Sequence, residues 1–340
     1  MPSPTFGVII PTFNSVNTLQ QCLNPLILSL SPTDKILVID DASTDGTREL
    51  INEFKLNDSR IEFLDNPSRG PNAARNLGIE ILDTDYLLFV DSDDHLLPDA
   101  VGILRRHICT SWPDILVMGY CFFDPNRNSV LSKTSEKNKL LSFDKSWIID
   151  YAFRSRAYGH VCWNKVISRK LVMENKIRFL PDLVHGRDSL FSKQIAIHAS
   201  SLLVISDVLY ISLSRSLSFS RSFSLRNIDS AIDCALKISR LQIPCLPMVS
   251  RNLRLMSIYR SYSYIMIISA LRLPFSTYFL GIKKLKTSLR ALSRANGKRQ
   301  LQVALNSPIR AASIALFTHH PKPMYFIIRI LAPFLSFVNY

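Results

Sequence analysis

Short apolar runs alternate with amphipathic segments through the first 100 residues, and this alternation constrains the fold of the 340-residue chain more than any other feature. The apolar runs are short enough to be strands and are Phe6–Ile10, Lys35–Asp40, Ile61–Leu64 and Tyr86–Val90. The segments between them have helical spacing and are Asn14–Leu30, Ser43–Phe54 and Gly70–Leu82. Strands and helices that alternate in this way predict a parallel, doubly wound α/β sheet.

Polar residues follow three of these predicted strands at the point where each strand ends. They lie at 11–14, 40–46 and 91–94. Sheets of this kind bind ligands outside the carboxyl ends of their strands. We therefore expect the three polar segments to line one crevice.

Asp91, Asp93 and Asp94 form a cluster of carboxylates directly after an apolar strand. Like charges at this spacing repel each other, and a hard divalent cation would relieve the repulsion. Mg²⁺ and Mn²⁺ take oxygen ligands, commonly one or two carboxylates together with the oxygens of a bound diphosphate. The cluster predicts a metal–diphosphate site, and the alternative is an Asp-rich helix cap before Leu96.

Four sequence runs together resemble the family 2 glycosyltransferases, which have the GT-A fold. They are V-I-I-P-T-F-N, I-L-V-I-D-D-A-S-T-D-G-T, G-P-N-A-A-R-N-L-G-I and Y-L-L-F-V-D-S-D-D, and they occur in this order within residues 5–100. The resemblance implies a Rossmann-like, doubly wound mixed sheet. No G-x-G-x-x-G fingerprint follows the first strand, which argues against a dehydrogenase.

The resemblance also assigns roles in binding a nucleotide-sugar. Asp41 would accept a hydrogen bond from the base N3–H, a donor that uracil and thymine present and that a carboxylate can only accept. The base and ribose pocket would be lined by Pro11, Thr12 and Asn14. Arg75 would contact a phosphate or the ring edge, and its alternative is an ion pair on a helix surface.

The same resemblance distributes the carboxylates of the cluster around Mn²⁺ or Mg²⁺. Asp93 would be the direct metal ligand, Asp91 would serve the ribose or reach the metal through water, and Asp94 would support them. The expected donor is a nucleotide-diphospho-sugar, specifically a UDP-sugar.

A second set of runs resembles the subgroup that makes bacterial polysaccharides such as O-antigen and capsule. It comprises Trp163-Asn164-Lys165, Ile177-Arg178-Phe179 and residues 186–191, and it assigns Asp188 as the catalytic base of an inverting transfer. Arg187 stands where the subgroup has Glu, and a neighbouring cation favours an ionised but weaker base. The alternative role for Asp188 is a helix N-cap.

Serine alternates with larger residues from Ser212 to Ser224, and this period of two predicts a strand or an extended loop. The segment is similar to one that lies late in the family's catalytic domain. By this similarity Arg215 would close over the donor diphosphate, with Arg221 as the second candidate.

The positive charge of the chain lies almost entirely in its last third. The formal net charge is +14, yet residues 226–340 carry 17 basic and two acidic side chains. Apolar residues at helical spacing, from Tyr278 to Leu292, lie among these basic residues, which suits an anionic membrane surface. The alternative is a helix that packs on the catalytic domain. Without a recognised nucleic-acid-binding module, no nucleic acid is expected as a partner.

The sequence therefore predicts a GT-A catalytic domain at 1–225, with a nucleotide-sugar half at 1–100 and an acceptor half at 101–225, and a basic helical region at 226–340. The acceptor would be a glycan or a polyprenyl-diphosphate-linked sugar. Six cysteines without a Cys-x-x-Cys pair, and no visible signal peptide, predict a cytoplasmic enzyme. The basic region predicts that it is peripheral on the cytoplasmic face of the inner membrane. The rival hypotheses are an inactive glycan- or membrane-binding protein and a nucleotidyltransferase.

Overall fold

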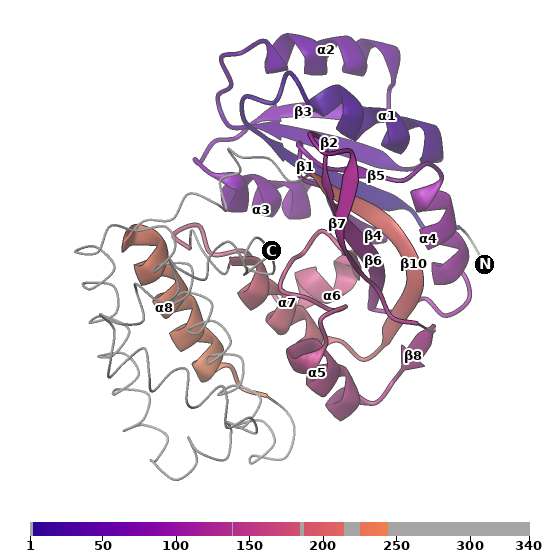
Figure 1. Ribbon diagram of the computed structural model, residues 1–340, viewed down its shortest axis with the longest axis vertical. Coiled ribbons are helices and arrows are strands. Elements are labelled where there is room, and N and C mark those ends of the chain that lie inside the picture. Colours follow the sequence, from indigo (N-terminus) through magenta and orange to yellow (C-terminus); the bar gives the residue numbers. More distant parts are fainter. Residues whose placement is uncertain (1–2, 138, 184–186, 214–224, 244–340) are drawn as a thin grey trace. The chain divides into compact units, whose positions relative to one another are not determined.

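The computed structural model describes residues 3–137, 139–183, 187–213 and 225–243 (Figure 1). The chain divides into two compact units, one of residues 1–181 with 191–216 and one of residues 182–190 with 217–340. The first unit contains the sheet and nearly all of the predicted site, and each unit is described by itself.

The described strands belong to one mixed sheet with the order β3-β2-β1-β4-β9-β6-β10-β5, to which β7 adds at β6 and β8 at β10. The strands are β1 (Phe6–Thr12), β2 (Lys35–Asp40), β3 (Ile61–Asp65), β4 (Tyr86–Phe89), β5 (His95–Leu96), β6 (Ile115–Asp124), β7 (Ser129–Thr134), β8 (Leu140–Ser142), β9 (Lys165–Ser168) and β10 (Leu202–Leu213). The helices are α1 (Leu19–Ser29), α2 (Thr47–Asn57), α3 (Pro71–Ile81), α4 (Ala100–Ile108), α5 (Lys145–Arg154), α6 (Arg169–Glu174), α7 (Arg187–His198) and α8 (Leu225–Arg240).

The first four strands are parallel to one another, as the alternation predicted. β1 lies between β2 and β4, so the carboxyl ends of these strands meet at one edge of the sheet. β9 then pairs antiparallel with β4 and β6, and this pairing makes the sheet mixed. The prediction of a mixed α/β sheet is confirmed.

Helices cover both faces of this sheet (Figure 1). Val8 and Ile10 of β1 belong to the same buried cluster as Leu23 and Leu26 of α1. Ile9 points to the other face, where α3 packs so closely that a Cβ on Gly78 would lie 2.7 Å from Ile9 Cγ2. Successive residues of one strand thus contact helices on opposite sides, which is the doubly wound arrangement.

Two predicted helices begin later than the sequence indicated. α1 begins at Leu19 rather than Asn14, because the backbone of Ser15 donates to Thr47 Oγ1 and Thr18 Oγ1 donates to the carbonyl of Ser92. α2 begins at Thr47, behind Gly46 at a φ of 95° and without a side-chain cap. Ser43, where the predicted helix begins, instead donates to the carboxylate of Asp40.

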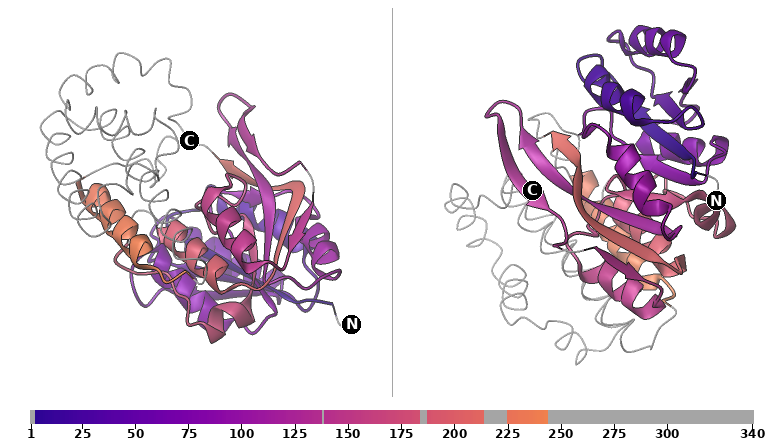
Figure 2. Two further views of the ribbon diagram at one scale, coloured as in Figure 1. Left: turned by 90° about the horizontal axis from the view of Figure 1, so that it is seen from below. Right: turned by 90° about the vertical axis from the view of Figure 1, so that its right-hand side faces the viewer.

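The acceptor half extends the same sheet rather than forming a separate one. β6 and β10 are long parallel neighbours, and Figure 2 shows the two long strands side by side, β10 in the salmon colour of its residues. β5 pairs antiparallel with β10 directly after the Asp-rich turn. The turn is therefore held between the nucleotide half and β10.

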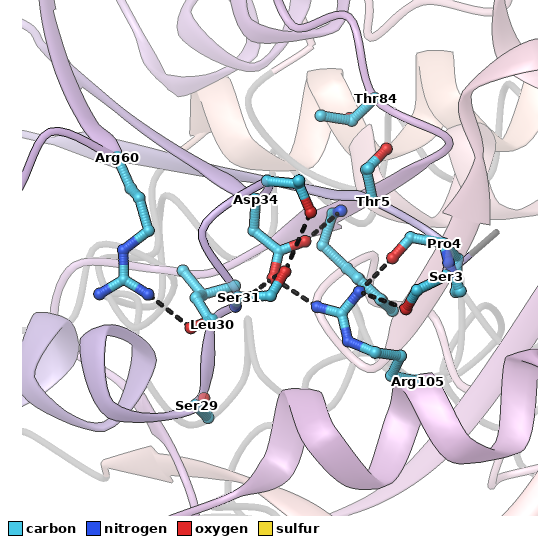
Figure 3. A network of polar contacts seen from close by, with 12 residues as sticks. Ser3, Pro4, Thr5, Ser29, Leu30, Ser31, Asp34, Arg60, Thr84 and Arg105 are labelled. Atoms are coloured by element: carbon cyan, nitrogen blue, oxygen red, sulfur yellow. Dashed lines mark hydrogen bonds and ion pairs between the residues drawn. The ribbon is translucent and has the colours of Figure 1, made fainter.

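At the amino ends of the strands, the carboxylate of Asp34 joins β1, β2 and α4 (Figure 3). It is fully buried, accepts from the backbone N–H of Phe6 at 2.8 Å and of Ser31 at 2.7 Å, and pairs with Arg105 of α4. This network fixes the edge of the sheet opposite the predicted site.

Of the second unit, the structure describes 182–183, 187–190 and 225–243. Within α8, Lys237 Nζ forms an ion pair with Asp233 one turn earlier. Among the described helices, none combines the length and the apolar character that crossing a membrane requires. The segment predicted from Ser212 to Ser224 is described only as far as Leu213, where β10 ends. The predictions for Arg215, for Arg221 and for the basic stripe from Tyr278 to Leu292 lie outside the described residues.

Candidate active site

The loop after β2 separates the two adjacent aspartates into different environments. Asp40 is fully buried, where it accepts from Ser43 and from Arg48, whose Nη1 lies 3.0 Å from Asp40 Oδ2. Asp41 is partly exposed, and its backbone N–H donates to Thr12 O at 2.9 Å. Asp41 is therefore the carboxylate of this pair that can face a ligand at the carboxyl end of β1.

Two neighbours orient the Asp41 carboxylate, and the sequence analysis missed both. Asn66 Nδ2 donates to Asp41 Oδ1 at 2.9 Å, and the backbone N–H of Gly70 lies 3.0 Å from Asp41 Oδ2. Asn66 directly follows β3, so the rule that polar residues after parallel strands share one edge would have found it. Each carboxylate oxygen can accept more than one hydrogen bond, which leaves Asp41 able to accept from a ligand as well.

The residues after β1 adopt a fixed loop beside Asp41. Asn14 has a φ of 48°, its backbone N–H donates to Ser43 Oγ at 2.8 Å, and its Oδ1 accepts from the backbone N–H of Thr44 at 2.9 Å. Asn14 therefore connects the loop after β1 to the loop after β2, and its side-chain oxygen makes one of the two hydrogen bonds between them. Pro11 is partly buried, and Thr12 Oγ1 is buried with no hydrogen-bond partner among the described residues.

The Asp-rich segment after β4 forms a tight turn closed by the Asp94 N–H donating to Asp91 O at 3.0 Å. Ser92 holds the turn to the start of α1, because its hydroxyl lies 2.8 Å from Ser15 Oγ and its carbonyl accepts from Thr18 Oγ1. Asp91 and Asp93 are partly exposed, whereas Asp94 is buried. The turn thus presents two of its three carboxylates to the outside.

Arg75 reaches this turn from α3 rather than pairing on a helix surface. Its guanidinium is 2% exposed and its Nη2 lies 2.7 Å from Asp91 Oδ1. It also lies over the ring of Phe179, 5.4 Å from the centroid. Arg75 therefore places a buried positive charge against the Asp-rich turn.

Asp94, which the resemblance assigned to the metal site, accepts two hydrogen bonds from β10 that the sequence did not predict. Its Oδ2 accepts from the hydroxyl of Tyr210 at 3.0 Å, and its Oδ1 accepts from the backbone N–H of Leu213 at 2.8 Å. Burial, together with the charges of Asp91 and Asp93, raises the pKa of Asp94 well above its usual range. Both oxygens of Asp94 thus join the turn to β10, which is a supporting position.

The remaining carboxylates suit a divalent cation held jointly with a substrate. Among the described residues, no group of three or more His, Cys, Asp or Glu side chains forms a complete metal site. Mg²⁺ is commonly held by one or two carboxylates plus substrate phosphates. Asp93 and Asp91, on a fixed turn beside Arg75, are the residues that fit this donor set.

Asp188 lies in the first turn of α7, where Arg187 Nε is 3.8 Å from its Oδ1. It belongs to the second unit, whereas Asp41, Asp91 and Arg75 belong to the first. Its role as the base remains a prediction. Phe191 of the same helix stacks on Phe179 with ring centroids 3.9 Å apart, and both residues belong to the first unit.

Comparison with known proteins decides the class of this domain. The profile of the family described as "Glycosyl transferase family 2" matches residues 7–167, which include β1 to β4 and the Asp-rich turn. Residues 7–167 are a family 2 glycosyltransferase domain. The resemblance drawn from the four sequence runs is confirmed.

Curated relatives of this glycosyltransferase domain are bacterial. The chain is 37% identical over 117 residues to glycosyltransferase GlyA of Streptococcus pneumoniae, covering 34% of this chain and 17% of GlyA. It is 28% identical over 215 residues to the poly(ribitol-phosphate) β-N-acetylglucosaminyltransferase TarS of Staphylococcus aureus, covering 60% of this chain and 35% of TarS. The chain thus spans well under half the length of these two relatives.

Solved structures agree on the fold of the domain. Residues 1–349 of S. aureus TarS in complex with UDP match with a TM-score of 0.73 at 19% identity, covering 97% of this chain and 91% of that one. A mannosyltransferase from Pyrobaculum calidifontis, in complex with GDP-Man and Mn²⁺, matches with a TM-score of 0.53 at 14% identity, covering 94% of this chain and 88% of that one. The GT-A fold predicted from the sequence is confirmed.

Proposed function

We propose that this chain is an inverting glycosyltransferase that moves a sugar from a UDP-sugar to a hydroxyl group of a glycan or lipid-linked oligosaccharide. The observation that carries the proposal is the position of Asp41. Its carboxylate lies at the carboxyl end of the sheet, oriented by Asn66 and Gly70. A carboxylate accepts hydrogen bonds only, so it favours a base with an N–H at the Watson–Crick edge, as uracil has.

The other site residues would bind the remainder of the donor. Pro11, Thr12 and Asn14 would contact the base and ribose, and the buried Thr12 Oγ1 has hydrogen-bonding capacity to offer. Arg75 would contact the diphosphate next to Asp91. Solved TarS structures contain UDP and UDP-GlcNAc, which supports the uridine assignment.

Asp93 would hold Mn²⁺ or Mg²⁺ directly and Asp91 would assist it. When bound, the cation supplies positive charge that stabilises the leaving diphosphate. Asp94 would keep the turn in place through Tyr210 and Leu213. The base of the reaction would be Asp188, which would accept the proton of the acceptor hydroxyl as that oxygen attacks the anomeric carbon.

The test of the donor assignment is calorimetric binding of nucleoside diphosphates to the full chain with Mn²⁺ present. We expect UDP to bind more tightly than CDP or ADP, because the ring nitrogens at the Watson–Crick edges of cytosine and adenine are acceptors. Equal binding of UDP and CDP would contradict the role given to Asp41, because cytosine presents an acceptor at N3.

We also propose that the enzyme works at the cytoplasmic face of the membrane in the synthesis of a bacterial surface polysaccharide. The support is the charge of residues 226–340, which carry 17 basic and two acidic side chains. Polybasic segments bind anionic lipid surfaces and are released by salt. Full-length protein should sediment with vesicles that contain anionic lipid and stay free with neutral vesicles, and equal sedimentation with both would contradict this part of the proposal.

A further inference from the structure

The hydroxyl group of Tyr210 lies between the Asp-rich turn and the end of β10. It donates to Asp94 Oδ2 at 3.0 Å and accepts from the backbone N–H of Asp91 at 3.2 Å. One hydroxyl thus contacts the first and the last residue of the turn that presents Asp93. Tyr210 is fully buried, so water cannot replace it without a rearrangement of the core.

Asp94 makes a second connection to the same strand. Its Oδ1 accepts from the backbone N–H of Leu213 at 2.8 Å, three residues after Tyr210. The carboxylate of Asp94 is therefore shared between a side chain and a backbone group of β10. The turn cannot shift away from β10 unless both hydrogen bonds break.

The ring of Tyr210 is itself held rigidly. It stacks on Trp163 with ring centroids 4.3 Å apart and an interplanar angle of 17°. Tyr210 pairs with Leu96 of β5 in the sheet, and the N–H of Leu97 donates to Leu209 O at 2.8 Å. A hydroxyl on so fixed a ring can define the position of whatever it contacts.

We propose that Tyr210 is a positioning residue of the donor site: its hydroxyl, acting with Asp94, sets the placement of the Asp91 and Asp93 carboxylates and thereby the affinity of the site for a divalent cation and a diphosphate. The inference rests on the proposed function, since it needs these carboxylates to face that ligand. Arg75 holds the Asp91 side chain at 2.7 Å, while Tyr210 holds the Asp91 backbone. Residues that orient metal-binding carboxylates commonly change metal affinity 10- to 100-fold when they are replaced.

The test compares Tyr210→Phe with Tyr158→Phe in the full chain. Tyr158 is also fully buried in the first unit, and its hydroxyl donates to the backbone carbonyl of Ser192 at 2.7 Å. Both variants lose one buried hydroxyl and keep the ring. Calorimetry would measure the affinity for Mn²⁺ at saturating UDP, and urea unfolding would measure stability in parallel.

Tyr210→Phe should weaken Mn²⁺ binding at saturating UDP about 10- to 100-fold, while Tyr158→Phe should leave it unchanged. Asp94→Asn provides a second variant, because one of its two terminal atoms becomes an NH2 donor and can no longer accept from Tyr210 or from Leu213. If the two residues act together, Tyr210→Phe combined with Asp94→Asn should weaken binding no more than the stronger single variant. The same loss in Tyr158→Phe, or a wild-type affinity in Tyr210→Phe, would overturn the inference.

The outcomes separate this inference from the proposed function. Failure of the wild-type chain to bind UDP with Mn²⁺ would overturn the proposed function and the inference with it. Wild-type binding that Tyr210→Phe leaves intact would overturn only the positioning role. An Asp94→Asn variant that loses the metal while Tyr210→Phe keeps it would show Asp94 to be a direct ligand and would also overturn the inference.

Discussion

Replacing Asp41 with Asn changes the recognition of the base with little change of shape. The carboxylate oxygens accept from Asn66 Nδ2 at 2.9 Å and from the backbone N–H of Gly70 at 3.0 Å. An Asn side chain would turn one oxygen into a donor that faces one of these N–H groups. A hydrogen bond to a charged group contributes about 1.5–3 kcal/mol. At about 1.4 kcal/mol for each factor of ten, Asp41→Asn should raise the Kd for UDP about 10- to 100-fold.

The assay is calorimetric titration of the full chain with UDP and with CDP, both with Mn²⁺. The wild-type chain should bind UDP more tightly than CDP. In Asp41→Asn the difference between the two Kd values should be smaller, because an amide can donate to the N3 acceptor of cytosine. Asp83→Asn serves as the control, since its carboxylate is 99% exposed at the opposite end of β4. An Asp41→Asn variant that binds UDP as tightly as wild type would refute the reasoning.

Three further substitutions test parts of the structure. Asp34→Ala removes a buried carboxylate that pairs with Arg105 and accepts hydrogen bonds from two backbone N–H groups. The substitution should lower the free energy of unfolding, measured by urea titration, by about 3 kcal/mol. An unchanged urea midpoint would contradict the network in Figure 3. Gly78→Ala should lower the melting temperature, because the added Cβ would lie 2.7 Å from Ile9 Cγ2. This clash should outweigh the helix propensity of alanine, which exceeds that of glycine by about 1 kcal/mol. A rise in the melting temperature would mean that α3 packs differently. Arg75→Gln should weaken the binding of UDP more than that of uridine, since the lost charge lies at the diphosphate position; equal effects on the two ligands would contradict that placement.

The fold was predictable from the sequence because its signals are local. The run Lys35–Asp40 is β2 with both ends as predicted, and the alternation of strands and helices gave the parallel arrangement of β1 to β4. The start of α1 was not predictable, because the contacts of Ser15 with Thr47 and of Thr18 with Ser92 delay the helix to Leu19. Such contacts join residues that no local pattern connects.

The candidate site also contains residues whose positions could be predicted from the sequence and a contact that could not. Asp41 and Asp91 were predictable because they follow strands whose carboxyl ends meet at one edge of a parallel sheet. The contact of Tyr210 with Asp94 was not predictable, since 116 residues separate them and no spacing rule links them. The resemblance assigned Asp94 to the support of the metal site. The structure adds that the Asp94 carboxylate connects the turn to β10 by two hydrogen bonds.

The most direct test of the proposed function is the release of UDP from a panel of UDP-sugars by the full chain, measured with Mn²⁺, with Mg²⁺ and with a chelator. The account predicts that at least one UDP-sugar is turned over, that the chelator stops the reaction, and that Asp93→Asn reduces it strongly while the variant remains folded. Folded wild-type protein that releases no UDP from any donor in the presence of either metal would contradict the account.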